Sequence, residues 1–225
     1  MPRHLQREIE RLKKKILELS ALVEDSVRKA VKSIAERNAD IAQKIIDTDQ
    51  AIDQMEVDIE EDCLKILALN QPVAIDLRFI VAVLKINNDL ERVGDLASNI
   101  AERAIFLSGR VKIDIPFDYP GMTELAQSML KKSLDALVNM DSKMAREVLI
   151  TDDRIDSMHR EMYFQIAEGI RKNPEQLDSY INLLAVSRQL ERIADHATNI
   201  AEDAIYMIDG EIVRNRGDDY YSNQA

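Results

Sequence analysis

Apolar residues recur every three or four positions through most of the chain, in six long stretches. This spacing places them on one face of an α-helix. The predicted helices span residues 4–37, 39–69, 73–108, 122–140, 142–172 and 175–208. Gly109 and Gly210 stand where a left-handed residue would end the third and sixth helices. Because each helix needs neighbours to bury its apolar face, we expect an all-α protein built from antiparallel three-helix bundles.

The pattern of the first three helices is repeated in the last three. Residues 90–106 (LERVGDLASNIAERAIF) and 190–206 (LERIADHATNIAEDAIY) are identical at 11 of 17 positions, at an offset of 100. The preceding helices align at an offset of 103, so the first copy has three more residues before its third helix. We therefore predict a tandem duplication of six long helices. Its parts are a first repeat at 1–109, a linker at 110–121, a second repeat at 122–210 and a flexible tail at 211–225.

Composition and charge narrow the possible environments and partners. The formal net charge of −11 disfavours contact with nucleic acid or an anionic membrane surface. The longest apolar run, residues 79–84, is too short to span a bilayer, and the first residues lack the apolar segment of a signal peptide. We therefore expect a cytoplasmic protein. Cys63 is the single cysteine and falls in a helical pattern, where we expect it to be buried.

Oxygen-bearing side chains form a stripe along the third helix of each copy. The stripe comprises Glu91, Asp95, Asn99 and Glu102 in the first copy and Glu191, Asp195, Asn199 and Glu202 in the second. The preceding helix contributes Asp49, Asp53, Glu56 and Glu60, which correspond to Asp152, Asp156, His159 and Tyr163. Residues three, four, seven or eleven positions apart lie on one side of a helix, so each set forms a single row.

Two interpretations of these rows remain open. A charged row opposite an apolar face is usually a solvated surface. Like charges four residues apart are unfavourable, however, and both copies keep them, which favours a cation that offsets the repulsion. Arg92 and Arg192 could supply it, as could a metal that prefers hard oxygen ligands. His159 could be a further ligand, whereas His4 and His196 are expected to be solvated.

Several enzyme classes lack their sequence signatures here. The chain has no glycine-rich phosphate loop, no G-x-S-x-G and no H-E-x-x-H. Di-metal oxidases of helical bundles use two Glu-x-x-His pairs, and this chain offers only Asp156-x-x-His159. We expect a protein that is not an enzyme. The alternatives are a carboxylate-bridged metal enzyme and a structural helical scaffold.

The duplicated LER[VI]xD-x-A-[ST]-N-I-A-E segment, D-x-x-[AR]-I-D-x-M on the preceding helix and residues 75–78 (IDLR) resemble the PhoU family. The resemblance covers about residues 5–208. It implies a cytoplasmic regulator that couples the phosphate ABC transporter to a sensor histidine kinase. Such a regulator acts negatively, keeping the phosphate-starvation response off when phosphate is plentiful.

The resemblance also implies partners and metal ligands. The partners are the ATPase subunit of the transporter and the kinase, so that the protein is peripheral to the membrane only through them. The E(D)-x-x-x-D motifs through which some family members bind multinuclear iron or another divalent metal match Asp49/Asp53, Glu91/Asp95, Asp152/Asp156 and Glu191/Asp195. Asn99, Glu102, Asn199 and Glu202 are expected as supporting ligands. The long amphipathic helices make a homodimer an additional expectation.

Overall fold

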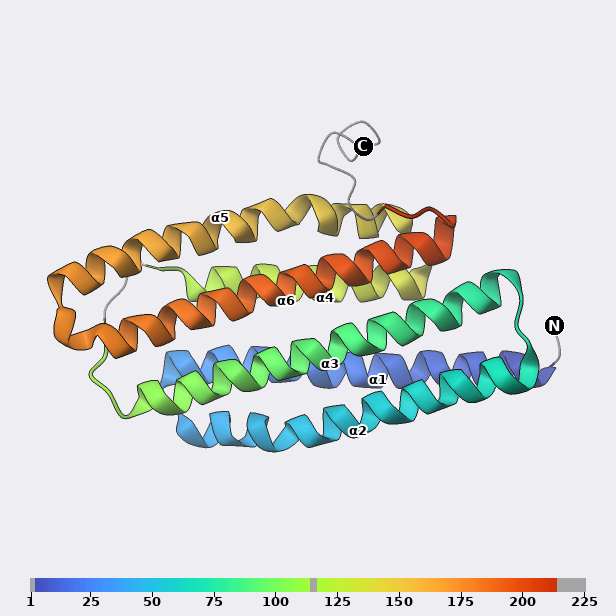
Figure 1. Cartoon of the computed structure of the whole chain (residues 1–225), viewed down its shortest axis with the longest axis horizontal. Coiled ribbons are helices and arrows are strands. Elements are labelled where there is room, and N and C mark those ends of the chain that lie inside the picture. The colour runs from blue at the N-terminus through green and yellow to red at the C-terminus, as the bar shows by residue number, and fades with distance from the viewer. Residues whose placement is uncertain (1–2, 114–116, 214–225) are drawn as a thin grey trace.

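The structure is a computed structural model that describes residues 3–113 and 117–213 (Figure 1). Its helices are α1 (Arg3–Glu36), α2 (Ala39–Asn70), α3 (Ala74–Ser108), α4 (Tyr119–Asn139), α5 (Ser142–Lys172) and α6 (Leu177–Asp209), with a short 3-10 helix at Pro174–Gln176. The all-α prediction is confirmed, and the predicted helix ends lie within three residues of those observed. The largest difference is at α4, which begins early because Asp118 caps it by accepting a hydrogen bond from the Gly121 amide at 2.8 Å.

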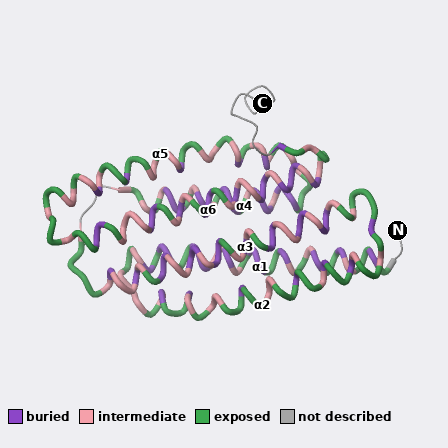
Figure 2. The backbone as a smooth tube through the Cα atoms, viewed as in Figure 1, coloured by how far each residue is buried: buried purple, intermediate pink, exposed green. Residues whose placement is uncertain are grey.

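Helices α1–α3 form bundle one and α4–α6 form bundle two, as the repeat predicts. In addition, α3 packs along α6 at least as extensively as it packs along the helices of its own bundle, and α1 contacts α4 (Figure 1). One apolar core consequently runs through both bundles. Figure 2 shows buried positions concentrated on the central helices, while α2 and α5 are largely exposed at the two outer edges.

Polar side chains cross the contact between α3 and α6. Lys85 Nζ lies 3.0 Å from Asp203 Oδ1, and Asp203 is almost completely buried. Asp89 Oδ1 lies 2.8 Å from His196 Nδ1 and accepts a hydrogen bond from Asn199 Nδ2 at 3.3 Å. Because buried polar groups need specific partners, these contacts fix the register of the two bundles. His196 is thus a contact between bundles, and the expectation that it is solvated was wrong.

The third helix of each bundle ends differently. Gly210 has a φ of 73°, the predicted left-handed cap of α6. Gly109 has a φ of −86°, so the prediction was wrong for α3. The Arg37 guanidinium donates hydrogen bonds to the Leu107 carbonyl in the last turn of α3 and to the Arg110 carbonyl just beyond the helix. Leu107 also accepts a hydrogen bond from the Arg110 amide at 3.1 Å, so its carbonyl is satisfied without a left-handed turn.

The segment between the repeats completes the core of bundle two. At the offset of 103, Tyr119 corresponds to Ile16, so α4 has no counterpart of the first four turns of α1. In bundle one those turns bury Leu5, Ile9 and Leu12. In bundle two, Ile113, Phe117 and Tyr119 cover Met162, Ile166 and Tyr180 instead. These three residues of the linker are therefore part of a small second core.

Two facing residues near the end of the α5–α6 hairpin differ in size from their counterparts in bundle one. The ring of Tyr180 packs directly on the backbone of Gly169, where an added Cβ atom would lie 2.5 Å from ring atom Cε1. The corresponding residues of bundle one are Ile66 and Ile80, both buried. A large residue on α6 is thus accommodated by the loss of a side chain on α5.

Two further expectations concern the tail and the cysteine. Residues 211–213 are packed, because Val213 is buried and Glu211 accepts a hydrogen bond from Arg146 Nη2 at 3.1 Å. The predicted tail thus begins with three residues that contact bundle two, and 214–225 lie outside the described residues. Cys63 is buried as expected, and this burial raises the pKa of its thiol to about 12.

In the described parts of the chain, no helix is long and apolar enough to cross a bilayer.

The contact of Tyr180 with Gly169 predicts an unusual sign for a glycine-to-alanine substitution. Gly→Ala inside a helix ordinarily stabilises by about 0.5–1 kcal/mol. We expect Gly169→Ala instead to lower the free energy of unfolding by about 1–3 kcal/mol, because the new methyl group collides with the ring. Urea denaturation followed by circular dichroism measures the change. Gly109→Ala is the control, since a Cβ atom there meets nothing within 4 Å. Stabilisation by Gly169→Ala would contradict the packing described.

Candidate functional site: an acidic helix pair in each bundle

The acidic rows of α2 and α3 face one another in bundle one. Gly94 permits a close approach of the helices, since a Cβ atom there would lie 3.1 Å from Ile52 and 3.7 Å from Asp49 Oδ1. Burial raises the pKa of Asp49, the nearby Ser98 hydroxyl lowers it, and the charges of Asp53 and Asp95 raise it further. The carboxylates of two different helices therefore repel one another across this contact.

Bundle two repeats the arrangement with a stronger effect. Burial, followed by the charges of Asp195 and Asp156, raises the pKa of Asp152 to about 6. The pKa of Glu191 is also raised, by burial and by the same two aspartates, with Arg188 and Arg192 opposing. The four predicted Asp/Glu pairs are thus brought together two by two, α2 with α3 and α5 with α6.

The hydroxyl residue next to the acidic pair also differs between the bundles, being Ser98 in bundle one and Thr198 in bundle two. The Thr198 hydroxyl donates its hydrogen bond at 2.7 Å to the backbone carbonyl of Asp195 within its own helix. The Ser98 hydroxyl is buried and, within the described residues, has no hydrogen-bond partner. The large pKa shift of Asp152 therefore comes from burial and from the neighbouring carboxylates.

The same carboxylate oxygen lacks a partner in both bundles. Asp49 Oδ1 and Asp152 Oδ1 occupy equivalent positions, both are inaccessible to solvent, and within the described residues neither has a hydrogen-bond partner. Buried polar atoms are normally satisfied, so a repeated exception requires an explanation. Arg92, which the sequence suggested as a counter-charge, pairs with other acids than Asp49. It lies 3.4 Å from Glu91 Oε2 and 3.3 Å from Asp95 Oδ2.

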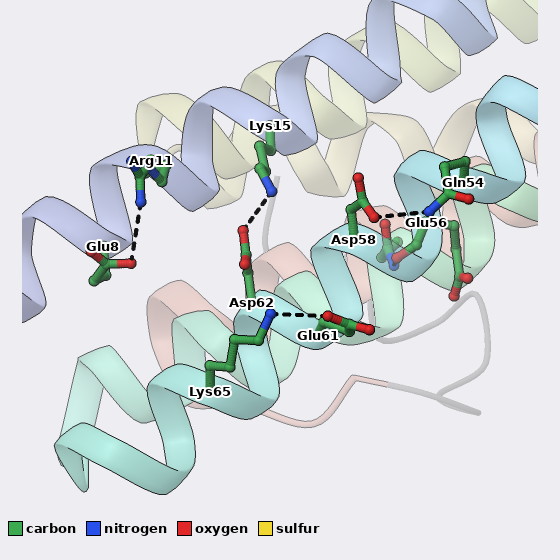
Figure 3. A network of polar contacts seen from close by, with 10 residues as sticks. Glu8, Arg11, Lys15, Gln54, Glu56, Asp58, Glu61, Asp62 and Lys65 are labelled. Carbon is green, nitrogen blue, oxygen red and sulfur yellow. Dashed lines mark hydrogen bonds and ion pairs between the residues drawn. The ribbon is translucent and has the colours of Figure 1, made fainter.

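The other acids of α2 are used differently. Figure 3 shows Lys15 reaching from α1 to Asp62 at 2.6 Å, with Glu61 bound to Lys65 and Asp58 to Gln54. Those carboxylates have local partners. Across the described residues, by contrast, neither Asp49 nor Asp53 forms an ion pair. The acids of α2 thus divide into a paired outer set and an unpaired row that faces α3.

The surroundings of His159 favour a neutral imidazole whose Nδ1 carries the proton. Its Nδ1 lies 3.0 Å from the hydroxyl oxygen of Ser187, and that hydroxyl donates its own proton to the Leu184 carbonyl at 2.9 Å. The proton between the first two atoms therefore belongs to His159 Nδ1, which leaves the lone pair on Nε2. Burial and then Arg188 lower the pKa of His159, with Asp156 opposing. This state is the one in which histidine binds metals.

The predicted supporting ligands do not all join these pairs. Asn199 donates to Asp89 on the other bundle, and so it belongs to the contact between bundles. Asn99 and Glu202 are half-buried and Glu102 is exposed. Sequence reasoning missed Asp89, which has a glutamine counterpart in the second copy and therefore no repeat to draw attention to it. Ser98 was visible as a repeated [ST], but nothing in the pattern indicated its proximity to Asp49.

The donor set fits a hard divalent cation in its chemistry, since it offers carboxylate oxygens with unused lone pairs. The side chains do not surround a single point in this conformation. Within residues 3–113 and 117–213, no group of three or more His, Cys, Asp or Glu is arranged to hold a metal ion.

The raised pKa of Asp152 predicts a pH-dependent effect of its replacement. The folded-state pKa of about 6 lies above the ordinary aspartate pKa of 3.8, so stability from the neutral form is present at low pH and lost as the pH rises through 6. Asp152→Asn imitates the neutral form. Allowing for solvent screening, we expect it to raise the free energy of unfolding by about 1–2 kcal/mol at pH about 7.5, and by much less at pH about 4.5. Urea titrations at both pH values measure this, with exposed Glu124→Gln on α4 as control. An equal gain at both pH values would argue against charge repulsion.

Comparisons with known proteins match the whole arrangement. The PhoU domain model matches residues 16–104 and 120–204, one match for each bundle. The phosphate-specific transport system accessory protein PhoU homologue of Aquifex aeolicus is 36% identical over 210 residues, covering 93% of this chain and 95% of that protein. The crystal structure of PhoU from Pseudomonas aeruginosa has a TM-score of 0.86 at 34% identity, covering 92% of this chain and 99% of that one.

A second solved structure agrees. The phosphate transport system regulatory protein PhoU from Streptococcus pneumoniae has a TM-score of 0.82 at 30% identity, covering 93% of this chain and 99% of that one. The two family-model matches fall on the two repeats found in the sequence, and the solved structures reproduce both bundles and their arrangement. This chain belongs to the PhoU family.

Proposed function

We propose that this protein is a cytoplasmic accessory regulator of phosphate uptake that represses the phosphate-starvation response when phosphate is plentiful. The observation that carries the proposal is the match of nearly the whole chain to relatives named phosphate-specific transport system accessory proteins. The match includes both bundles. The regulator acts by binding and not by catalysis.

The proposed partners are the ATPase subunit of the phosphate transporter and a sensor histidine kinase. A net charge of −11 and the acidic rows of both bundles suit basic surfaces on such partners. The protein reaches the membrane only through them, and it acts as a homodimer.

Deletion of the gene tests the regulatory role. In phosphate-replete cells, we expect alkaline phosphatase activity to rise on deletion and to fall again when the intact gene is restored. Glu91→Lys/Asp95→Lys should complement poorly, because it reverses the charge of the acidic row. Asp58→Lys/Glu61→Lys, on the outer face of α2, is the matched control and should complement well. Unchanged phosphatase activity on deletion would favour the metal-enzyme or scaffold alternatives.

We propose further that each acidic helix pair binds a divalent metal, with iron in a multinuclear cluster as one form. Asp49, Asp53, Glu91 and Asp95 would hold it in bundle one, and Asp152, Asp156, Glu191 and Asp195 in bundle two. The metal would supply positive charge that relieves the repulsion between carboxylates. Support comes from the raised pKa values and from the solvent-inaccessible oxygens of Asp49 and Asp152.

Metal titration tests this part separately. We expect Mn²⁺ to raise the melting temperature of the metal-free protein, and this rise to shrink in Asp49→Asn/Asp53→Asn and in Asp152→Asn/Asp156→Asn. Isothermal titration calorimetry gives the stoichiometry. Asp58→Asn/Glu61→Gln changes the same number of acids on the outer face and should leave the rise intact. Equal effects of all three double substitutions would mean that Mn²⁺ acts through general charge.

A further inference from the structure

The end of the α5–α6 hairpin exposes an apolar surface that the fold does not require. Tyr163 and Phe164 of α5 are 58% and 72% exposed, and Leu177 and Ile181 of α6 are 43% and 51% exposed. The two rings meet edge to face with centroids 6.0 Å apart. These four residues are called the hairpin tip. An exposed group of large apolar residues on a single structural unit indicates a binding surface more often than an isolated one does.

Contacts on either side show how these residues lie along the hairpin. His159 contacts Ser187 and Gly169 contacts Tyr180, so Tyr163 and Phe164 lie opposite residues 183–184 of α6, about one turn from Ile181. Ile181 also faces outward. Leu183, about 200° away on the helix, lies on the side that holds Tyr119, whose hydroxyl donates to its carbonyl at 2.7 Å.

The hairpin tip continues directly into the acidic site of bundle two. Tyr163 follows Asp152, Asp156 and His159 on one side of α5, at positions i, i+4, i+7 and i+11. Moving along α5 from the hairpin end, a partner would meet first an apolar and aromatic surface and then carboxylates that repel one another. A basic group placed on those carboxylates would relieve the repulsion.

Bundle one provides an internal comparison. Its residues at the positions of Tyr163 and Phe164 are Glu60 and Glu61, and Glu61 is paired with Lys65 at 2.9 Å. The same helix pair therefore folds with acids at this place, so aromatic residues are not needed for packing. Their presence in one bundle only indicates a role outside the fold.

We propose that the hairpin tip and the adjacent acids of bundle two bind an amphipathic, basic helix of a partner protein. Apolar residues of that helix pack on Tyr163, Phe164 and Ile181, and its lysine or arginine residues lie against Asp156 and Glu191. This is a helix laid on an apolar surface with complementary charge at its side. The inference rests on the proposed regulator role, since it requires a protein partner, and it names the surface.

Charge selects this occupant over two others. A second copy of the chain carries a net charge of −11 and would bring further negative charge to the same carboxylates. An anionic membrane would be repelled in the same way. A basic helix alone matches both the apolar residues and the acids beside them.

A model peptide tests the proposal without knowledge of the natural partner. The probe is an 18-residue peptide with leucines on one helical face and lysines on the other, and a scrambled peptide of the same composition is its control. Fluorescence anisotropy of labelled peptide at physiological ionic strength gives the affinity. Tyr163→Glu/Phe164→Glu, which introduces the bundle-one residues, is expected to weaken binding of the amphipathic peptide at least tenfold.

The matched control is Val57→Glu/Leu64→Glu, which places two glutamates on exposed apolar positions of α2. It should leave peptide affinity within twofold of the parent, and circular dichroism melting checks that both variants fold. Equal losses in both double variants, or equally tight binding of the scrambled peptide, would overturn the proposal in favour of general charge attraction.

Two other results would also overturn it. If Tyr163→Glu/Phe164→Glu converts a dimer to a monomer in light scattering, the hairpin tip is a subunit interface. If the parent protein binds phosphatidylglycerol vesicles and the variant does not, the tip is a membrane contact. Neither result affects the proposed regulator role, because that role is tested separately by phosphatase activity after gene deletion.

Discussion

The antiparallel contact between α3 and α6 is the constraint on which the rest of the structure depends. It joins two bundles into one apolar core, and its buried Asp203 and the Asp89–His196 pair set the register of one bundle on the other. Because α3 and α6 also carry the inner acids of both sites, the same contact fixes where those sites lie. Helices α2 and α5 then add the outer acids from the two edges (Figure 1).

Within each bundle, packing places carboxylates where electrostatics alone would not. The apolar faces of α2 and α3 hold the helices together, and the acids at the border of those faces are brought close despite their repulsion. The free energy that core packing contributes to folding exceeds the cost of holding these few carboxylates close together. This is the usual physical situation of a binding site, where local stability is lower so that a ligand can restore it.

The sequence was sufficient to predict the helices, the repeat and the acidic rows along them, because these depend on periodicity and on comparison of one copy with the other. It did not indicate which rows of different helices would face one another. It was insufficient wherever contacts lie between bundles. His196 was expected to be solvated because its helix position alone points away from its own acidic row, and its partner Asp89 is 107 residues distant. The role of Arg37 in capping α3 was likewise invisible, since its partners follow 70 and 73 residues later.

Covalent fusion of the two repeats has a consequence for how they can change. In a symmetric dimer of single bundles, every residue of the central contact would occur twice, and each substitution would alter both ends of the interface. In this chain the partner of Lys85 is Asp203, while the residue equivalent to Asp203 in the first repeat is Arg103. Each half of the interface can therefore evolve separately, and an ion pair can be built at one end without being imposed on the other.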